Sequence, residues 1–271
     1  MADRLTDILV APVPDVDPSS WAAALEEAKG TLAGLAVRRA GAGPFRVTGH
    51  EIRTALSDDV SDATHLAGQP PFAWSARTAR RALGLAAVRL LVAGGARSPA
   101  EAVRARMEES CRWVRDGNPC ASRLDRWVAG LPPAGRAAVG AETVTWATRL
   151  WCALDWPALG SSLSIGRDRW WDSPHSALLA LRGRAEVRTE RANLVVLSGP
   201  RRASVRAELA LVTLVDSLRA RAGAIPGRVV GWWPDSGHLV RVEPEPAVLT
   251  LGADAVGLVL AGTGAPVRSA A

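Results

Sequence analysis

The sequence predicts a mixed α/β fold, and three features of its pattern lead to that prediction. Apolar residues recur at helical spacing through most of residues 76–154. The pattern then changes, and the short apolar runs at 177–188 and 193–198 are typical of strands. Two further apolar runs flank residues 234–237 (PDSG), a turn sequence that predicts a hairpin. We therefore expect a sheet preceded in the chain by a layer of helices.

The first 44 residues are expected to form an arm and one helix. Residues 1–20 are rich in Pro and Asp and predict an extended arm, while Ser19 and Ser20 predict a helix that begins at Trp21. Residues 40–44 (AGAGP) should end this helix. This break separates an N-terminal segment, 1–44, from a main domain, 45–265. Within that domain we expect the helical part at about 70–155 and the sheet core at about 165–265.

Capping residues and apolar periodicity predict where the helices of the main domain begin and end. Residues 46–56 predict a short helix or a strand leading into one, and 57–69 predict a polar loop. Ser75 is the expected N-cap of one helix and Ser98, followed by Pro99, that of the next. In chain order, the longer helices are expected at 76–93, 99–115, 121–131, 136–154, 204–221 and 246–261.

Arginine supplies nearly all of the positive charge. The chain has 33 basic residues against 27 acidic ones, and Lys29 is its one lysine. A net charge of +6 and a pI near 10.6 suit a polyanionic partner such as nucleic acid. The alternative is a solvated surface shaped by codon bias.

The cysteines and the N-terminus indicate a cytoplasmic protein. Cys111, Cys120 and Cys152 are odd in number and lack CxxC spacing, so we expect free thiols in a reducing compartment. The N-terminus carries acids and prolines where a signal peptide needs a basic flank and an apolar run. No stretch approaches the roughly 18 apolar residues of a transmembrane helix, so no membrane partner is expected.

Three segments in order resemble the RecB-like branch of the PD-(D/E)XK nucleases. Residues 70–74 (PPFAW), followed by the basic stretch 76–85 (ARTARRALGL), look like that family's Cys-Pro-aromatic step into a basic helix. Residues 181–186 (LRGRAE) look like its Gly-x-x-Asp motif, with Glu186 in the metal-ligand position. Residues 194–199 and the helix sequence after them look like its D/E-x-K strand and the following helix. The resemblance covers about residues 45–265 and implies a restriction-endonuclease-like mixed sheet, with a helical layer inserted before the core strands.

The chain departs from that family at the positions of the catalytic acid and lysine. The second strand should end in an acid, a spacer and a lysine, yet residues 195–201 are VVLSGPR. Lys29 lies outside the resemblance, and arginine stays protonated and cannot replace lysine. Hydrolysis of a phosphodiester by this route needs a divalent cation held by carboxylates. If the site is active, the resemblance implies Mg²⁺ on Glu186 with Glu208 as the other catalytic acid; otherwise no cofactor is expected.

Each acid near this site has a structural alternative. Glu186 can pair with Arg184 or Arg188 on its strand, and Glu208 can be an exposed acid in the first turn of a helix. Other acids that could help hold a metal are Asp168, Asp172 and Glu190. Of these, Asp172 before Ser-Pro has the pattern of a turn residue, and Glu190 that of a solvated loop.

Arginines near the expected strands and helices are candidates for binding nucleic acid. These candidates are Arg77, Arg80, Arg81, Arg184, Arg201, Arg202 and Arg206. The first three recur at helical spacing, and the last three lie where a strand ends and a helix begins, a place that favours phosphate. The pairs Trp170-Trp171 and Trp232-Trp233 could add stacking platforms, or each could have one core member and one rim member. We favour the second interpretation for Trp232-Trp233.

Other chemistries find no support in the motifs. His50, His65, His175 and His238 lack the spacing of a zinc site. The chain has no GxSxG elbow for acyl transfer and neither GxxxxGK[ST] nor GxGxxG for nucleotide binding.

These patterns predict a nucleic-acid-binding, catalytically inactive RecB-like protein, a pseudonuclease. It would act in a DNA or RNA processing or defence complex, with DNA favoured over RNA and other protein subunits as further partners. Two alternatives stay open. One is an active Mg²⁺-dependent (exo)nuclease with relocated ligands, and the other is a protein–protein scaffold that binds no nucleic acid.

Overall fold

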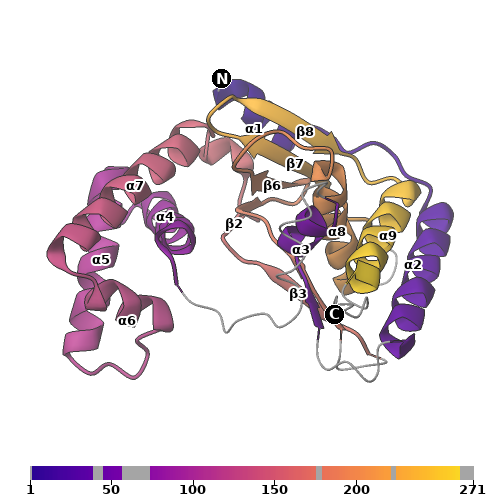
Figure 1. Cartoon of the computed structure of the whole chain (residues 1–271). Coiled ribbons are helices and arrows are strands. Elements are labelled where there is room, and N and C mark those ends of the chain that lie inside the picture. The colour runs from indigo at the N-terminus through magenta and orange to yellow at the C-terminus, as the bar shows by residue number, and fades with distance from the viewer. Residues whose placement is uncertain (1, 39–44, 57–73, 175–178, 221–223, 263–271) are drawn as a thin grey trace, which may run out of the picture. The chain divides into compact units, whose positions relative to one another are not determined.

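The chain divides into two compact units, each made of two stretches of sequence (Figure 1). The computed structural model describes residues 2–38, 45–56, 74–174, 179–220 and 224–262. The helical unit comprises residues 1–8 and 70–161, and the sheet unit comprises residues 9–69 and 162–271. The segments predicted as a helix break at 40–44 and as a loop at 57–69 lie outside the described residues.

The helical unit is built around one central helix. Its elements after residue 70 are α4 (Ala76–Val92), α5 (Pro99–Arg115), α6 (Arg123–Gly130), α7 (Pro133–Cys152) and the short 3₁₀ helix η2 (Pro157–Leu159). Helix α5 packs against α4, α6 and α7, and α4 also packs against α7. Small and branched apolar side chains such as Ala79, Leu83 and Val128 form the core between these helices.

Hydroxyl caps fix where these helices begin. Ser75 accepts a hydrogen bond from the backbone N–H of Thr78 at 3.3 Å, and Ser98 accepts one from Glu101 at 3.2 Å. Both predicted N-caps are therefore confirmed. Helix α7 begins three residues earlier than predicted, at Pro133, because a proline suits the first helical turn.

Eight strands in the described residues make up two sheets. Their bounds are β1 (Phe45–Val47), β2 (Ser164–Ile165), β3 (Arg169–Asp172), β4 (Leu179–Gly183), β5 (Val187–Arg188), β6 (Ala192–Val196), β7 (Arg228–Trp233) and β8 (His238–Val242). One sheet has the order β1-β4-β3 and the other β2-β5-β6-β7-β8. The pairs β1–β4 and β6–β7 are parallel and the rest are antiparallel. Mixed sheets alongside helices confirm the α/β class.

Helix α8 (Val205–Arg219) is the centre of the sheet unit. It packs against β3, β4, β7 and β8, and against α9 (Pro246–Gly262). The other helices are α2 (Pro18–Arg38), which packs on α9, and α3 (Gly49–Ala55), which follows β1. Gly183 lets β4 approach α8 closely, since a Cβ there would lie 3.0 Å from Val215 Cβ. The predicted hairpin is confirmed as β7–β8, where Gly237 takes a φ of 66°.

The N-terminal predictions were wrong in two places. Residues 2–10 form a helix, α1 (Ala2–Val10), instead of an extended arm. Leu5 and Thr6 on it are buried, and the Thr6 hydroxyl accepts the N–H of Asp155 at 2.8 Å. The next helix begins at Pro18 and not at Trp21, because the Asp17 carboxylate accepts the N–H groups of Ser19 and Ser20.

Among the described helices, none is both long enough and apolar enough to cross a bilayer.

Candidate functional site

Glu186, the expected metal ligand, is completely buried between β4 and β5. Its Oε1 lies 2.6 Å from Arg184 Nη2 and 2.8 Å from Arg184 Nε. Its Oε2 accepts the backbone N–H of Val196 at 2.7 Å. Both carboxylate oxygens therefore bind groups of the protein itself, as a buried carboxylate requires. Of the two alternatives for a structural role, the pairing is with Arg184.

Glu208 is the second acid of the expected site, and an arginine holds it as well. It lies in the first turn of α8, where Arg202 forms a bidentate pair with it through Nε–Oε1 at 2.7 Å and Nη2–Oε2 at 2.8 Å. The Ser204 hydroxyl donates to Oε1 at 2.9 Å. Its side chain is 10% exposed, so the alternative of an exposed acid was wrong. The fork of two charge-assisted bonds is the strongest geometry open to such a pair.

The remaining acids considered for a metal do not gather around Glu186. Asp168 pairs with Arg182, and Glu190 is exposed, as predicted. Asp172 was predicted in a turn but is the last residue of β3, where it lies opposite Ala180 of β4. Among the described residues, no three His, Cys, Asp or Glu side chains form a group that could hold a metal ion.

The arginines proposed from sequence fall into both units. Arg77, Arg80 and Arg81 lie on α4 of the helical unit, and Arg80 pairs with Glu142 of α7 at 3.5 Å. The rest lie in the sheet unit, as Arg184, Arg201, Arg202 and Arg206. Arg184 and Arg202 bind Glu186 and Glu208, whereas Arg201 and Arg206 are exposed near the start of α8.

A buried network in the sheet unit was missed by sequence reasoning. Arg188 Nη1 lies 2.6 Å from Asp216 Oδ2, and the Asn193 amide donates to the same oxygen at 2.7 Å. Arg188 also donates to the carbonyls of Gly183 and Arg167. Burial lowers the pKa of the Arg188 guanidinium, and the charge of Asp216 opposes that effect. This network joins β5 and β6 to α8 and leaves Arg188 unavailable to Glu186.

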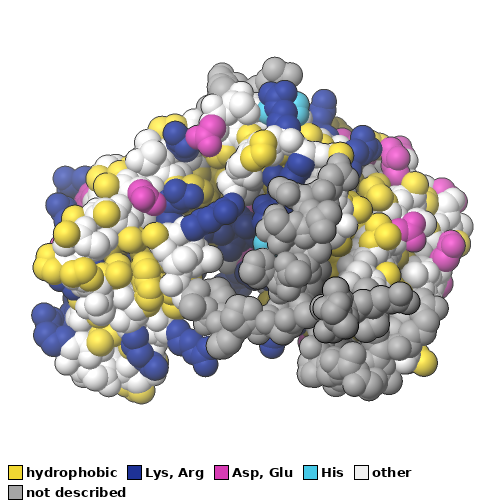
Figure 2. All heavy atoms as spheres, viewed as in Figure 1, with side chains coloured by type: hydrophobic (Ala, Val, Ile, Leu, Met, Phe, Trp, Pro, Cys, Tyr) yellow, Lys and Arg dark blue, Asp and Glu magenta, His cyan; other side chains and the backbone are white. Residues whose placement is uncertain are grey.

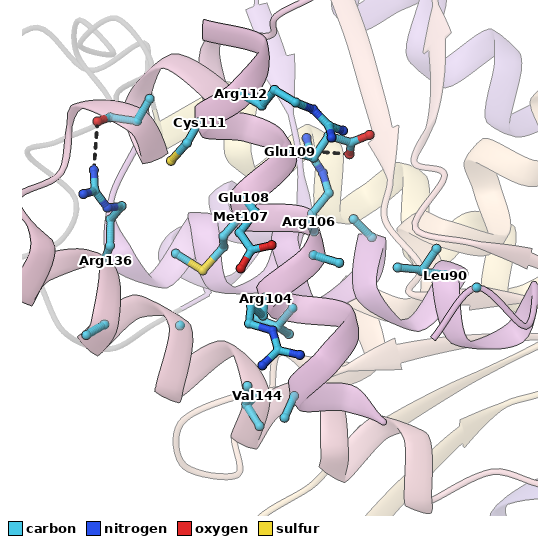
Figure 3. Close-up of a pocket in the computed structure, with 18 of the residues that line it drawn as sticks. Leu90, Arg104, Arg106, Met107, Glu108, Glu109, Cys111, Arg112, Arg136 and Val144 are labelled. Atoms are coloured by element: carbon cyan, nitrogen blue, oxygen red, sulfur yellow. Dashed lines mark hydrogen bonds and ion pairs between the residues drawn. The ribbon is translucent and has the colours of Figure 1, made fainter. Parts of the chain in front are cut away.

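A cavity of about 1520 Å³ runs along α5 in the helical unit, and its charged lining is mostly basic (Figure 3). The acidic members are Glu108 and Glu109, and the apolar floor includes Met107 and Val144. The basic members are Arg89, Arg104, Arg106, Arg112, Arg115 and Arg136. Arg106 forms ion pairs with Glu109 at 3.3 Å and with the buried Asp125 at 2.6 Å.

The helical part of the chain carries the whole charge excess. Residues 74–161 hold 13 of the 33 basic residues and 7 of the 27 acidic ones, so the remaining 20 basic and 20 acidic residues balance. Figure 2 shows arginine side chains around the end of the unit formed by α5 and α6, with few acidic side chains beside them. A count of charged residues by segment predicts an arginine-rich helical unit from the sequence, whereas the motifs do not indicate it.

The structure also tests what the sequence predicts for the tryptophan pairs and the cysteines. Trp232 and Trp233 are both buried, so the expectation of one core and one rim member was wrong for this pair. Trp170 and Trp171 are half-buried on β3. All three cysteines are free thiols, as predicted.

The fold and these sites define a mixed α/β protein with a separate, arginine-rich helical unit. No protein family, no curated protein and no solved structure matches the chain.

Proposed function

We propose that this protein binds nucleic acid, DNA in preference to RNA, without hydrolysing it, and that it descends from RecB-like nucleases. The observation that carries the proposal is the concentration of the net charge of +6 in residues 74–161, around a cavity lined by six arginines and two glutamates. Excess arginine on one unit is the electrostatic footprint of a polyanion-binding surface.

The order of elements supports the proposed ancestry. A set of helices precedes β4, which ends at Gly183 three residues before Glu186. The apolar strand β6, helix α8 and the hairpin β7–β8 follow. This is the order in which the resembling segments occur in the RecB-like branch. Residues 70–73 of the first motif lie outside the described residues, and Trp74 precedes α4.

The ion pairs of Glu186 and Glu208 support binding without hydrolysis. A divalent cation would have to displace Arg184 from a completely buried carboxylate or Arg202 from a bidentate pair. The displaced guanidinium would stay charged beside the incoming cation, which opposes binding. Arginine therefore neutralises the carboxylates that Mg²⁺ would have neutralised in an active relative.

The exposed cavity arginines provide a direct test of binding. Arg104 and Arg112 line the cavity from α5 and are both exposed. Changing both to Gln should weaken binding of a labelled DNA duplex and reduce the slope of log K against log salt by about 2, since each phosphate contact contributes about 0.9. Arg191→Gln/Arg241→Gln removes the same charge from exposed positions of the sheet unit and serves as the control. Fluorescence anisotropy with single- and double-stranded DNA and RNA gives the readout.

Each outcome bears on one candidate function. A loss confined to the cavity variant supports the proposal, and equal effects in both double variants contradict the assignment to the helical unit. Metal-dependent cleavage would favour the active nuclease with relocated ligands. A wild-type chain that binds none of the four nucleic acids at low salt would contradict nucleic-acid binding and leave the scaffold.

A further inference from the structure

Three arginines from three elements of the sheet unit converge on Trp170. The guanidinium carbon of Arg46 on β1 lies 5.7 Å from the centroid of the Trp170 ring, and that of Arg182 on β4 lies 5.4 Å from it. Arg219, the last residue of α8, donates to the backbone carbonyl of Trp170. Guanidinium groups within about 6 Å of an indole centroid are held there by the ring's quadrupole.

The register of the small sheet brings these residues together. Trp170 is the direct cross-strand partner of Arg182, and Arg46 is paired with Ala180 on the other edge of β4. Leu179, Leu181 and Gly183 alternate with them along β4 and are buried. Because side chains along a strand alternate between faces, Arg46, Trp170 and Arg182 share the face turned away from the core.

The three arginines at Trp170 are accompanied by two acids, Asp168 and Asp172. Arg182 pairs with Asp168. Asp172 is the further acid on β3. Within the described part of the chain, neither Arg46 nor Arg219 has a carboxylate in an ion pair, and both are exposed.

We propose that Arg46, Trp170, Arg182 and Arg219 form a binding surface for a single strand of DNA, an inference that rests on the proposed nucleic-acid function. The arginine forks suit phosphate oxygens, and the indole offers an aromatic contact for a base. Because Trp170 already holds the three arginines, less side-chain freedom is lost when phosphate binds. A duplex hides its base faces, so the aromatic contact favours a single strand.

Arg46 and Trp170 are the residues to change. Anisotropy of a labelled oligothymidylate of about 16 nucleotides measures binding by the full chain. Arg46→Gln should lower the salt slope by about 0.7, the value for one phosphate contact on a single strand. Trp170→Leu should weaken single-strand binding about fivefold or more through the lost aromatic contact. Arg241→Gln on β8 removes an exposed charge elsewhere and should change neither quantity.

The outcomes separate this surface from the proposed function. If the wild-type chain binds oligothymidylate and both variants behave as Arg241→Gln does, the surface is contradicted while nucleic-acid binding stands. If the wild-type chain binds neither duplex nor single strand, both proposals fail. Should Trp170→Leu unfold, Arg46→Gln decides alone, since Arg46 is exposed and its loss breaks no carboxylate pair.

Discussion

Arg188 and Asp216 form a buried ion pair that joins β5 to α8, with Nη1 2.6 Å from Oδ2 and side chains 4% and 1% exposed. Asn193 donates to the same oxygen of Asp216, and Arg188 also donates to the Gly183 carbonyl. The other Asp216 oxygen lies 3.2 Å from Arg169 Nη1. In such a pair the electrostatic attraction roughly offsets the cost of desolvating both charges. Loss of one partner leaves the other charge buried and unpaired, which is strongly destabilising. The pair therefore makes β5 and α8 dependent on each other.

Asp216→Asn should lower the free energy of unfolding by about 3–5 kcal/mol, because Arg188 would remain buried without a carboxylate. Urea unfolding followed by circular dichroism measures this change. Asp254→Asn, on an exposed position of α9, is the matched control and should change the free energy by less than about 0.5 kcal/mol. Equal stabilities of the two variants would contradict a structural role for the pair.

Asp125 should make stability depend on acidity. Burial raises the pKa of this carboxyl, but hydrogen bonds from Ser122, Ser110 and Arg106 outweigh it and hold the pKa at about 2. Because the folded pKa lies below the unfolded one, near 3.9, the contribution of about 2–3 kcal/mol is present above pH 4 and disappears as the pH falls toward 2. The stability difference between wild type and Asp125→Asn should therefore shrink over that window. A difference that stays constant from about pH 5 to 2 would refute the assignment.

Two helical glycines should respond to alanine with opposite signs. A Cβ at Gly84 in α4 would lie 2.4 Å from Trp146 Cε3, while one at Gly34 in α2 would meet nothing within 4 Å. Gly34→Ala should stabilise by about 0.5–1 kcal/mol through helix propensity, and Gly84→Ala should destabilise by about 1–3 kcal/mol through overpacking. Thermal and urea unfolding of both variants measure the two changes. Stabilisation by Gly84→Ala would mean that Trp146 does not pack on α4 as described.

Divalent cations should not stabilise the chain at Glu186. A metal that binds only the folded state raises the thermal midpoint, so about 10 mM MgCl₂ or MnCl₂ should leave it unchanged relative to NaCl of equal ionic strength. Arg184→Met should lower stability by about 1–3 kcal/mol, since Glu186 would lose its guanidinium partner. A rise in the midpoint with Mg²⁺ that Glu186→Gln abolishes would instead establish a metal site there.

Local signals in the sequence predicted much of the fold. Ser75 and Ser98 cap their helices through groups three residues away, and residues 234–237 fix a hairpin through turn chemistry. Strands β2 and β3 were not expected, because they are only two and four residues long and exist through pairing with β5 and β4. Their identity is decided by partners distant in sequence.

The contacts of the candidate site could likewise be predicted only where they join residues that are close in the sequence. Arg184 lies two residues from Glu186 in the segment between β4 and β5, so their pairing could be predicted from the sequence. Asp216 lies 28 residues from Arg188, and no local pattern connects them. The cavity arginines needed the packing of α4, α5 and α7 to bring them to one groove.

The most direct test of the central claim follows binding and integrity of labelled DNA in the same sample, with Mg²⁺ or Mn²⁺ against EDTA and over a salt series. We predict that the bound fraction falls steeply with salt, is the same with metal and with EDTA, and leaves the DNA intact. Metal-dependent cleavage that is lost in Glu186→Gln would contradict the claim that the site is inactive. Absence of binding at low salt would contradict the nucleic-acid function itself.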